Sequence, residues 1–268
     1  MTRSFAIAPI TAPELSPPEL ARAAADAGYS HIGVRMLPSA PNGFFWPLLD
    51  DAALLQATIE SLRDTGMKVL DIDIVRLNPT SDPAAFQRFL DAGQALGARA
   101  VLVAADDPDM ERLAANFGAL CDLAALRGLS IDIEFMPWTT IPDLAAALRL
   151  MAAVDRANAG IVVDTLHVDR ARVGLAELAA IPSRYLHYMQ ICDAPAERPD
   201  SIEAMIHTAR SERLYPGEGG LDLLGMMRAL PADIPISVEV PKETLARTVD
   251  GRTRARMAIE ATKAVLSV

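Results

Sequence analysis

Short apolar runs alternate with longer segments of helical period along the whole chain. The longer segments repeat apolar residues every three or four positions, which is typical of helices that bury one face. Several end in glycine, the residue that most easily adopts the left-handed turn closing a helix: Gly28, Gly66, Gly97 and Gly128. The short runs are predicted strands at 4–10, 31–35, 68–75, 99–105, 130–135, 160–164, 185–192 and 236–240.

Eight alternations of strand and helix predict an α/β fold, a (β/α)8 barrel, as a single domain over residues 1–268. The length fits, because such barrels typically use about 250 residues. An open, doubly wound sheet is the alternative, but no GxGxxG motif follows the first predicted strand and no phosphate-binding loop motif occurs. In a barrel, active groups belong at the carboxyl ends of the strands and in the loops that follow them.

The amino-acid composition limits the classes of molecule that the protein is expected to bind. A formal net charge of −10 argues against nucleic acid, whose phosphates require an excess of Lys and Arg. The two cysteines, Cys121 and Cys192, supply neither a disulfide framework nor a zinc cluster. No signal peptide or membrane-spanning run is apparent. We therefore expect a cytoplasmic protein that binds a small molecule rather than a membrane, with its oligomeric state, a homo-oligomer included, left open.

Polar side chains end four of the predicted strands, the fifth to the eighth. These are Glu134, Asp164, Gln190 and Glu239. Any one of them alone is as readily a solvated loop residue or a helix cap. Because parallel strands of a closed barrel end at one mouth, the four together predict an oxygen-rich metal site. Alternation along 130–135 also places Asp132 and Glu134 on the interior face, where charge is costly unless it is paired or bound to metal.

Oxygen ligands of this kind favour a hard divalent cation, Mn²⁺ or Mg²⁺, ahead of zinc, since no thiolate and at most one imidazole is expected nearby. Such a cation polarises a carbonyl and stabilises an enediolate. A carboxylate on each side of the substrate can then move a proton. The pattern therefore indicates an enzyme that abstracts a proton next to a carbonyl.

The order of these residues resembles the xylose-isomerase-like TIM-barrel superfamily of sugar-phosphate isomerases and epimerases. Glu134 is followed by Asp164-Thr-Leu-His167, a polar residue on the seventh strand, Arg213-Leu-Tyr-Pro-Gly-Glu-Gly and Glu239. The resemblance implies that Glu134, Asp164 and Glu239 bind the metal and that Glu134 and Glu239 form the acid/base pair. It also implies that His167 and Arg213 contact substrate oxygens.

Two departures from that family change the expected chemistry. The usual seventh-strand ligand is histidine, where this chain has Gln190, whose amide oxygen can still bind Mn²⁺ or Mg²⁺. Glutamine there is similar to bacterial 3-dehydroshikimate dehydratases, which eliminate water from a cyclic keto acid by the same proton abstraction. Against that likeness, Met136 stands where several relatives, dehydratases included, carry a catalytic histidine. His187 lies an odd number of residues from Gln190, so alternation predicts that it faces away in a structural role.

Arg35 ends the second predicted strand and is a candidate substrate-binding residue. A guanidinium can bind a carboxylate or a phosphate through two hydrogen bonds, so Arg35 and Arg76 indicate an anionic substrate. The alternative is a salt bridge from an arginine to Asp71 or Asp73.

Two long irregular loops follow predicted strands, at 36–50 and 193–220. Loops of this length in a compact domain usually carry function, so we expect them to form lids or substrate walls. The first contains Phe44, Phe45 and Trp46, and Trp138 follows the fifth strand closely. These aromatic side chains either line a sugar-sized pocket or contribute to the core.

Our first hypothesis is a divalent-metal-dependent isomerase or epimerase acting on a small polyhydroxylated carbonyl compound. The second is a 3-dehydroshikimate dehydratase-type lyase using the same metal site, favoured by Gln190 and Arg35 and weakened by Met136. A remote alternative is an endonuclease for abasic DNA, which would need several metal-binding histidines and a basic face. The last is a barrel that binds a ligand without catalysis.

Overall fold

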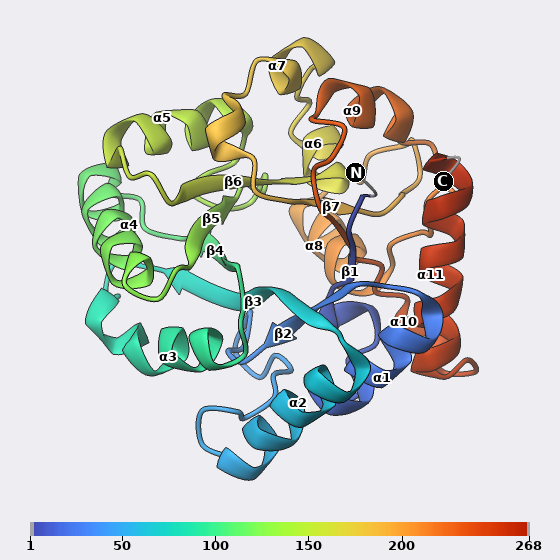
Figure 1. The fold of residues 1–268 in the computed structure, drawn as a ribbon. Coiled ribbons are helices and arrows are strands. Elements are labelled where there is room, and N and C mark those ends of the chain that lie inside the picture. Colours follow the sequence, from blue (N-terminus) through green and yellow to red (C-terminus); the bar gives the residue numbers. More distant parts are fainter. Residues whose placement is uncertain (1–2, 267–268) are drawn as a thin grey trace.

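The structure is a computed structural model that describes residues 3–266, and it confirms the predicted (β/α)8 barrel. Eight parallel strands close in sequence order, so that β1 pairs with both β2 and β8 (Figure 1). The strands are β1 (Phe5–Ile7), β2 (His31–Arg35), β3 (Lys68–Leu77), β4 (Ala100–Ala105), β5 (Ser130–Glu134), β6 (Ala159–Asp164), β7 (Met189–Ile191) and β8 (Ile236–Val238).

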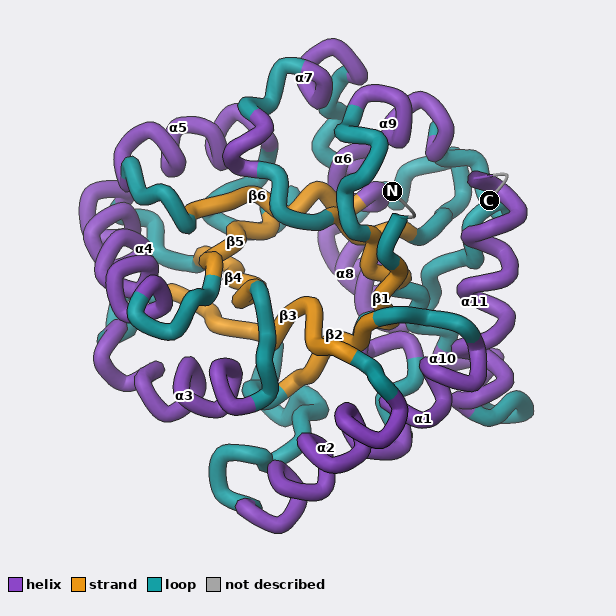
Figure 2. Tube along the Cα trace, in the orientation of Figure 1, coloured by secondary structure: helices purple, strands orange, loops and turns teal. Residues whose placement is uncertain are grey.

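Helices surround the strands as an outer ring (Figure 2). They are α1 (Pro17–Ala27), α2 (Ala52–Thr65), α3 (Gln87–Ala95), α4 (Met110–Ala125), α5 (Leu144–Val154), α6 (Thr165–Arg170), α7 (Leu175–Ala179), α8 (Ile202–Ser211), α9 (Leu223–Ala229), α10 (Glu243–Ala246) and α11 (Gly251–Leu266), with short 3-10 helices η1 (Pro9–Thr11), η2 (Pro83–Phe86) and η3 (Ser183–Tyr185). Within residues 3–266, no helix has the length and apolar character needed to cross a bilayer.

The predicted helix ends are confirmed at four glycines. Gly28, Gly66, Gly97 and Gly128 all have φ between 68° and 84°, the left-handed conformation that costs glycine least. The seventh strand is shorter than predicted: β7 begins at Met189, and residues 183–185 form η3 instead. Pro182 precedes that turn, and its restricted φ favours a turn over an extended strand at this point.

Buried side chains form two hydrophobic groups. The larger lies between the strands and the helices, and the smaller fills the barrel interior with residues that include Leu102, Val162 and Tyr188. Interior positions also carry charged groups, because Asp132 and Glu134 on β5 are both buried, as the alternation predicts.

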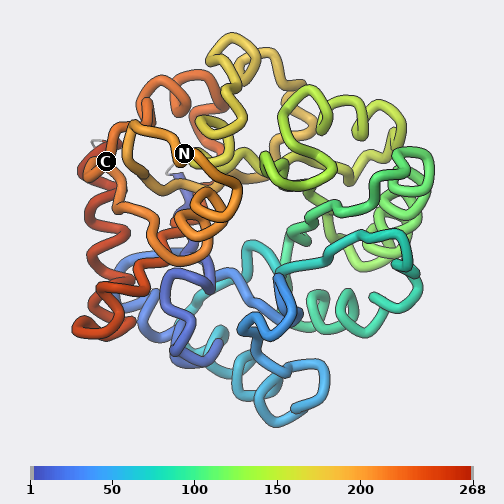
Figure 3. Tube along the Cα trace, turned by 180° about the vertical axis from the view of Figure 1, so that it is seen from behind, coloured from blue at the N-terminus to red at the C-terminus, as the bar shows by residue number. Residues whose placement is uncertain are grey.

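The strands end at one side of the barrel, which we call the mouth; the side where they begin is the base. Segment 193–220, which includes α8, lies in front of the barrel when the molecule is seen from behind (Figure 3). Its glycine-rich turn wraps around the Asp193 carboxylate, which accepts hydrogen bonds from the backbone of Gly217, Gly219 and Leu221. A Cβ at Gly219 would lie 2.4 Å from Asp193 Oδ1, so this turn requires a residue without a side chain.

Candidate active site

The four polar residues predicted from the strand ends lie at the mouth. Glu134 and Asp164 are the last residues of β5 and β6, Gln190 lies in β7, and Glu239 follows β8 directly. Each is at most 5% exposed. Their position follows from the closed barrel, because neighbouring parallel strands bring their carboxyl ends together.

Asp164 also caps the helix that follows it. Its Oδ1 accepts hydrogen bonds from the backbone N–H groups of Leu166 and His167, at 2.7 and 3.3 Å, so α6 starts immediately after β6. This tight connection places the His167 ring within the mouth, with Nε2 3.6 Å from Glu134 Oε1. Ligand atoms of Glu134, Asp164 and His167 all lie within 4.8 Å of one another.

Arg213 links two of the four strand-end residues, Asp164 and Glu239. Its guanidinium makes ion pairs with Asp164 Oδ2 at 2.6 Å and with Glu239 Oε2 at 3.0 Å. Nε donates to the carbonyl of Ala209, which fixes the side chain on the turn after α8. Gln190 Nε2 donates to Glu239 Oε1 at 3.1 Å. Arg213 therefore balances two of the three buried carboxylates.

The pKa values of these groups differ for physical reasons. Burial, followed by the nearby Glu239 and Asp164, raises the pKa of Glu134 well above its usual value. Burial also raises the pKa of Glu239 to about 7. Burial acts in the same direction on Asp164, but Arg213 and His167 outweigh it and lower that pKa. Burial lowers the pKa of His167 to about 4, so its imidazole is neutral at neutral pH.

This donor set fits a divalent cation. Glu134 accepts no hydrogen bond from the part of the chain that the structure describes, and Gln190 Oε1 is buried without a partner there. A neutral His167 offers nitrogen, which places it among the possible ligands as well as among the predicted substrate contacts. The residues can therefore hold a metal ion, and a cation bound to Asp164 and Glu239 would compete with the Arg213 guanidinium.

The salt-bridge alternative for Arg35 is what the structure shows. Arg35 donates to Asp73 Oδ2 through Nε at 2.8 Å and through a second, shorter contact, and the pair is buried. Arg76 pairs with Asp106, whose Oδ2 lies 2.6 Å from its guanidinium. Arg35 also lines the same cavity as Glu134, so the salt bridge does not remove it from the mouth.

Arg210 is a cation that the sequence reasoning missed. It lies on α8, three residues before Arg213, and lines the cavity over Glu134. No carboxylate of residues 3–266 lies within 4.0 Å of its guanidinium. Burial, then the charges of Arg76 and Arg35, lowers its pKa, while the charge of Asp106 acts in the opposite direction.

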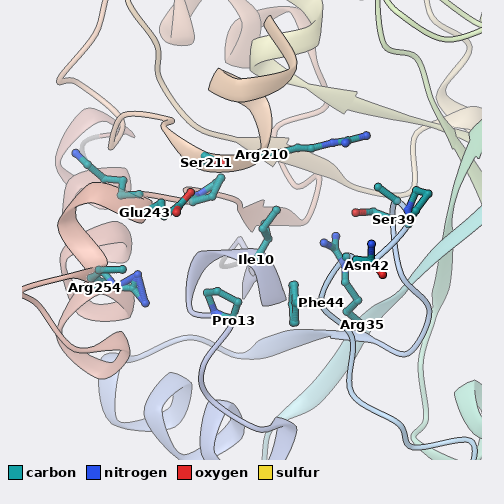
Figure 4. Close-up of a pocket in the computed structure, with 16 residues that line it drawn as sticks. Ile10, Pro13, Arg35, Ser39, Asn42, Phe44, Arg210, Ser211, Glu243 and Arg254 are labelled. Atoms are coloured by element: carbon teal, nitrogen blue, oxygen red, sulfur yellow. The ribbon is translucent and has the colours of Figure 1, made fainter. Parts of the chain in front are cut away.

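Two connected spaces lead to the site. The inner cavity, which Glu134 and Glu239 line, has a volume of about 50 Å³, enough for one or two water molecules. An outer pocket of about 360 Å³ shares four residues with it: Ile10, Arg35, Ser39 and Arg210. Figure 4 shows the Arg210 side chain extending across this pocket toward the loop that carries Ser39.

Aromatic and apolar side chains form part of the walls, as the loop composition predicts. Phe44 lies under the Arg35 guanidinium, 5.1 Å from ring centroid to Cζ. Trp138 meets His167 edge to face, with ring centroids 5.2 Å apart, and lines the inner cavity. Met136 is buried beside them, so this wall position has no titratable group. Phe45 is instead exposed, and Trp46 packs against the core.

Comparison with known proteins identifies relatives of this chain. Residues 21–265 match a protein-family model described as xylose isomerase-like TIM barrel. A 3-dehydroshikimate dehydratase from Pseudomonas aeruginosa is 33% identical over 185 residues, which covers 62% of this chain and 28% of the relative. The chain therefore spans well under half of that curated relative.

Solved structures show the same fold. The crystal structure of the IolI protein with a bound zinc atom superposes with a TM-score of 0.81 at 20% identity, covering 98% of both chains. D-allulose 3-epimerase from Methylomonas sp. superposes with a TM-score of 0.72 at 19% identity, also covering 98% of each chain.

Proposed function

The chain belongs to the xylose isomerase-like TIM barrel family, and we propose that it is a metal-dependent lyase of the 3-dehydroshikimate dehydratase type. The observation that carries this choice is Arg210, a guanidinium at the mouth without a carboxylate partner among the described residues. A carboxylate on the substrate would supply the missing charge, whereas an uncharged sugar would not. The similarity to a dehydratase supports the same choice. The lyase thus becomes the first hypothesis and the isomerase the second, which is the reverse of the order that the sequence alone favours.

The residues at the mouth have distinct parts in this proposal. Glu134, Asp164, Gln190 and Glu239 would hold Mn²⁺ or Mg²⁺, with His167 as a further possible ligand. When bound, the ion would polarise the ketone and favour the ionised carboxylates around it. Glu134 faces the inner cavity and accepts no hydrogen bond from the described residues, so its oxygens are free to take the proton next to the ketone.

The elimination requires a second proton transfer. The bond between the α-carbon and its hydrogen breaks, and the proton moves to Glu134. The hydroxyl at the β-carbon then leaves as water after it receives a proton from an acid. Glu239 is the second carboxyl group that lines the same cavity, and in this proposal it carries that proton. Trp138 and Met136 contribute apolar surface to the walls of the inner cavity.

The cavity volumes place the body of the substrate in the outer pocket. The inner cavity of about 50 Å³ admits only the reacting end of a sugar-sized molecule. The outer pocket of about 360 Å³ lies within the usual range for small-molecule sites and contains Arg210. In this arrangement Arg210 and Arg35 would contact the carboxylate, while the ketone lies at Glu134.

A sugar epimerase is the second candidate. It is supported by the structural likeness to D-allulose 3-epimerase and by the pair of carboxylates, Glu134 and Glu239, at one cavity. An epimerase would return the abstracted proton to the same carbon rather than eliminate water.

One set of incubations distinguishes the two reactions. The protein is stripped of metal with a chelator, reloaded with Mn²⁺ or Mg²⁺, and incubated with 3-dehydroshikimate and with a panel of ketoses in deuterated water. We expect an ultraviolet-absorbing aromatic acid from 3-dehydroshikimate, only in the reloaded samples. Deuterium in a recovered ketose without elimination would support the epimerase instead.

The matched control is Glu134→Gln, which has the same shape without an ionisable group. If the reloaded wild-type protein formed neither product, or if Glu134→Gln retained full activity, the proposed function would be refuted.

A further inference from the structure

A second pocket lies at the base of the barrel, opposite the mouth. Its volume is about 630 Å³, and it is lined mainly by residues at or near the start of β3 to β8. None of its lining residues belongs to the proposed active site. The volume lies within the range of sites that enclose one small organic molecule.

A hydrogen bond between His187 and Asp132 forms one wall of this base pocket. His187 Nδ1 lies 2.7 Å from Asp132 Oδ1, and Ser130 Oγ donates to Asp132 Oδ2 at 2.6 Å. The hydrogen bond to Asp132 is the largest cause of a raised pKa for His187. Asp132 is fully buried, whereas the His187 side chain is 28% exposed and lines the pocket. The imidazole therefore lines the pocket in an orientation that Asp132 fixes.

The neighbouring strand leaves room for this pair. A Cβ at Gly160 on β6 would lie 2.1 Å from Asp132 Oδ1 and 2.5 Å from His187 Nδ1, distances that real atoms do not adopt. Glycine at this position is thus required for His187 to reach Asp132. The pair fixes the ring orientation before any ligand arrives, which reduces the ordering cost of binding.

Arg99 adds a cation to the same pocket. It is exposed, directly precedes β4, and has no carboxylate of residues 3–266 within 4.0 Å. Burial, followed by the charges of Arg99 and Lys68, lowers the pKa of the nearby His31 to about 4. Arg99 therefore has no carboxylate partner among the described residues at this end of the barrel.

The rest of the wall is mainly apolar. Leu70, Leu129, Leu186 and Pro235 also line the pocket that Arg99 and His187 share. One free cation with one oriented imidazole matches a single negative charge, and the apolar wall matches a hydrocarbon or aromatic body. A polyanion such as a nucleotide would require more cations than the pocket contains.

We propose that the base pocket binds a small organic carboxylate with an apolar or aromatic body, held by Arg99 and His187. The ligand would be separated from the proposed catalytic residues by the interior of the barrel. Binding at the base thus does not depend on the reaction at the mouth.

Calorimetric titration of the full chain, loaded with Mn²⁺, tests this proposal with three probes. Benzoate has the charge and the apolar ring, benzamide has the ring without the charge, and acetate has the charge without the ring. We expect saturable binding of benzoate at least about tenfold tighter than that of either other probe, as expected for one charge-assisted contact. Equal affinity for acetate would overturn the assigned ligand class.

Variants locate the bound anion. Arg99→Gln and His187→Gln should each weaken benzoate binding by about tenfold or more. Arg99 is exposed, so its variant is expected to fold normally even if His187→Gln does not. Arg63→Gln, at an exposed position on α2, is the matched control for loss of a charge and should leave the affinity unchanged.

Arg210→Gln separates the two ends of the barrel. Benzoate affinity should be unaffected by this change at the mouth. If binding were lost in Arg210→Gln and kept in Arg99→Gln, the anion would lie at the mouth and the proposal would be wrong. Absence of saturable benzoate binding would overturn it equally.

Discussion

Strand β5 carries one buried carboxylate toward each end of the barrel, and the two are bonded differently. Asp132, near the base, is bound on both oxygens, by Ser130 and His187. Glu134, at the mouth, accepts no hydrogen bond from the described residues, and the nearest imidazole nitrogen, His167 Nε2, is 3.6 Å away. Both residues are at most 5% exposed, so burial does not distinguish them. The difference lies in how many hydrogen bonds each carboxylate accepts from the protein.

We propose that this difference separates a structural carboxylate, Asp132, from a reactive one, Glu134. A carboxylate whose lone pairs are all engaged stabilises the fold and has little capacity to accept a proton from a substrate. One that is buried with free lone pairs is costly to the fold and retains that capacity. The comparison therefore predicts that changes at the mouth affect turnover, whereas changes at the base affect stability.

The largest expected effect is at Glu134. Replacing it by glutamine removes the base and should lower turnover of the dehydratase substrate by about a thousandfold, within the usual range for a general base. Because Glu134 makes no hydrogen bond to the described residues, the melting temperature should stay the same or rise. Steady-state kinetics and thermal unfolding of the same preparation check both points. A large loss of stability would remove the contrast with Asp132.

Arg210 should have the next largest effect. Arg210→Gln removes the cation without a carboxylate partner and should raise KM for an acidic substrate about ten- to hundredfold, with a smaller change in kcat. Arg63→Gln on α2 serves as the control. The KM for a neutral ketose should not change. Equal effects on acidic and neutral substrates would argue against Arg210 as the anion contact.

Asp132→Asn tests the base. It leaves His187 and Ser130 with a neutral partner in place of a carboxylate, at a cost of about 1–3 kcal/mol in the free energy of unfolding. For a chain of this size that corresponds to a fall in melting temperature of several degrees, roughly 2–4 °C for each kcal/mol. Turnover should change less than about twofold. A loss of turnover comparable to that of Glu134→Gln would show that Asp132 is part of the reactive machinery.

The smallest expected effect is the pH dependence of stability in chelator. Burial raises the pKa of Glu239 to about 7, above its value in the unfolded chain. Between pH 4.5 and 7 the folded state therefore binds more protons than the unfolded state, and stability falls as the pH rises. Glu134, with its raised pKa, acts in the same direction.

Glu239→Gln removes one of these groups and should reduce the fall in melting temperature across that interval by a few degrees. Thermal unfolding at several pH values, with chelator present throughout, measures the slope. An identical slope in the variant and the wild-type protein would show that Glu239 does not titrate in this range.

The local pattern of apolar residues and glycines along the chain was enough to predict most of the fold. The eight strands and the glycine-terminated helices depend on residues close in sequence, such as Gly66 and Gly128, whose left-handed φ values follow from short-range sterics. Strand-end positions also placed Glu134 and Asp164 correctly at the mouth, because barrel closure brings consecutive strand ends together.

The pairing of charges could not be predicted in the same way. Arg213 reaches Asp164 across 49 residues, and Arg35 reaches Asp73 rather than Asp71. Such choices depend on how loops fold over the mouth, and the sequence offers several acidic partners at similar spacing. Arg210 was missed for a related reason: its importance comes from the absence of a partner within residues 3–266, which no sequence pattern reports.

The ion pairs of Arg213 have a consequence for how the protein would acquire its metal. With a guanidinium already between Asp164 and Glu239, part of the repulsion among the mouth carboxylates is relieved before any ion arrives. Folding then need not wait for the metal, unlike that of small domains whose chain collapses only around zinc. Metallation becomes a late, exchangeable event, and the ion that occupies the site would be decided by cellular supply as much as by the ligands.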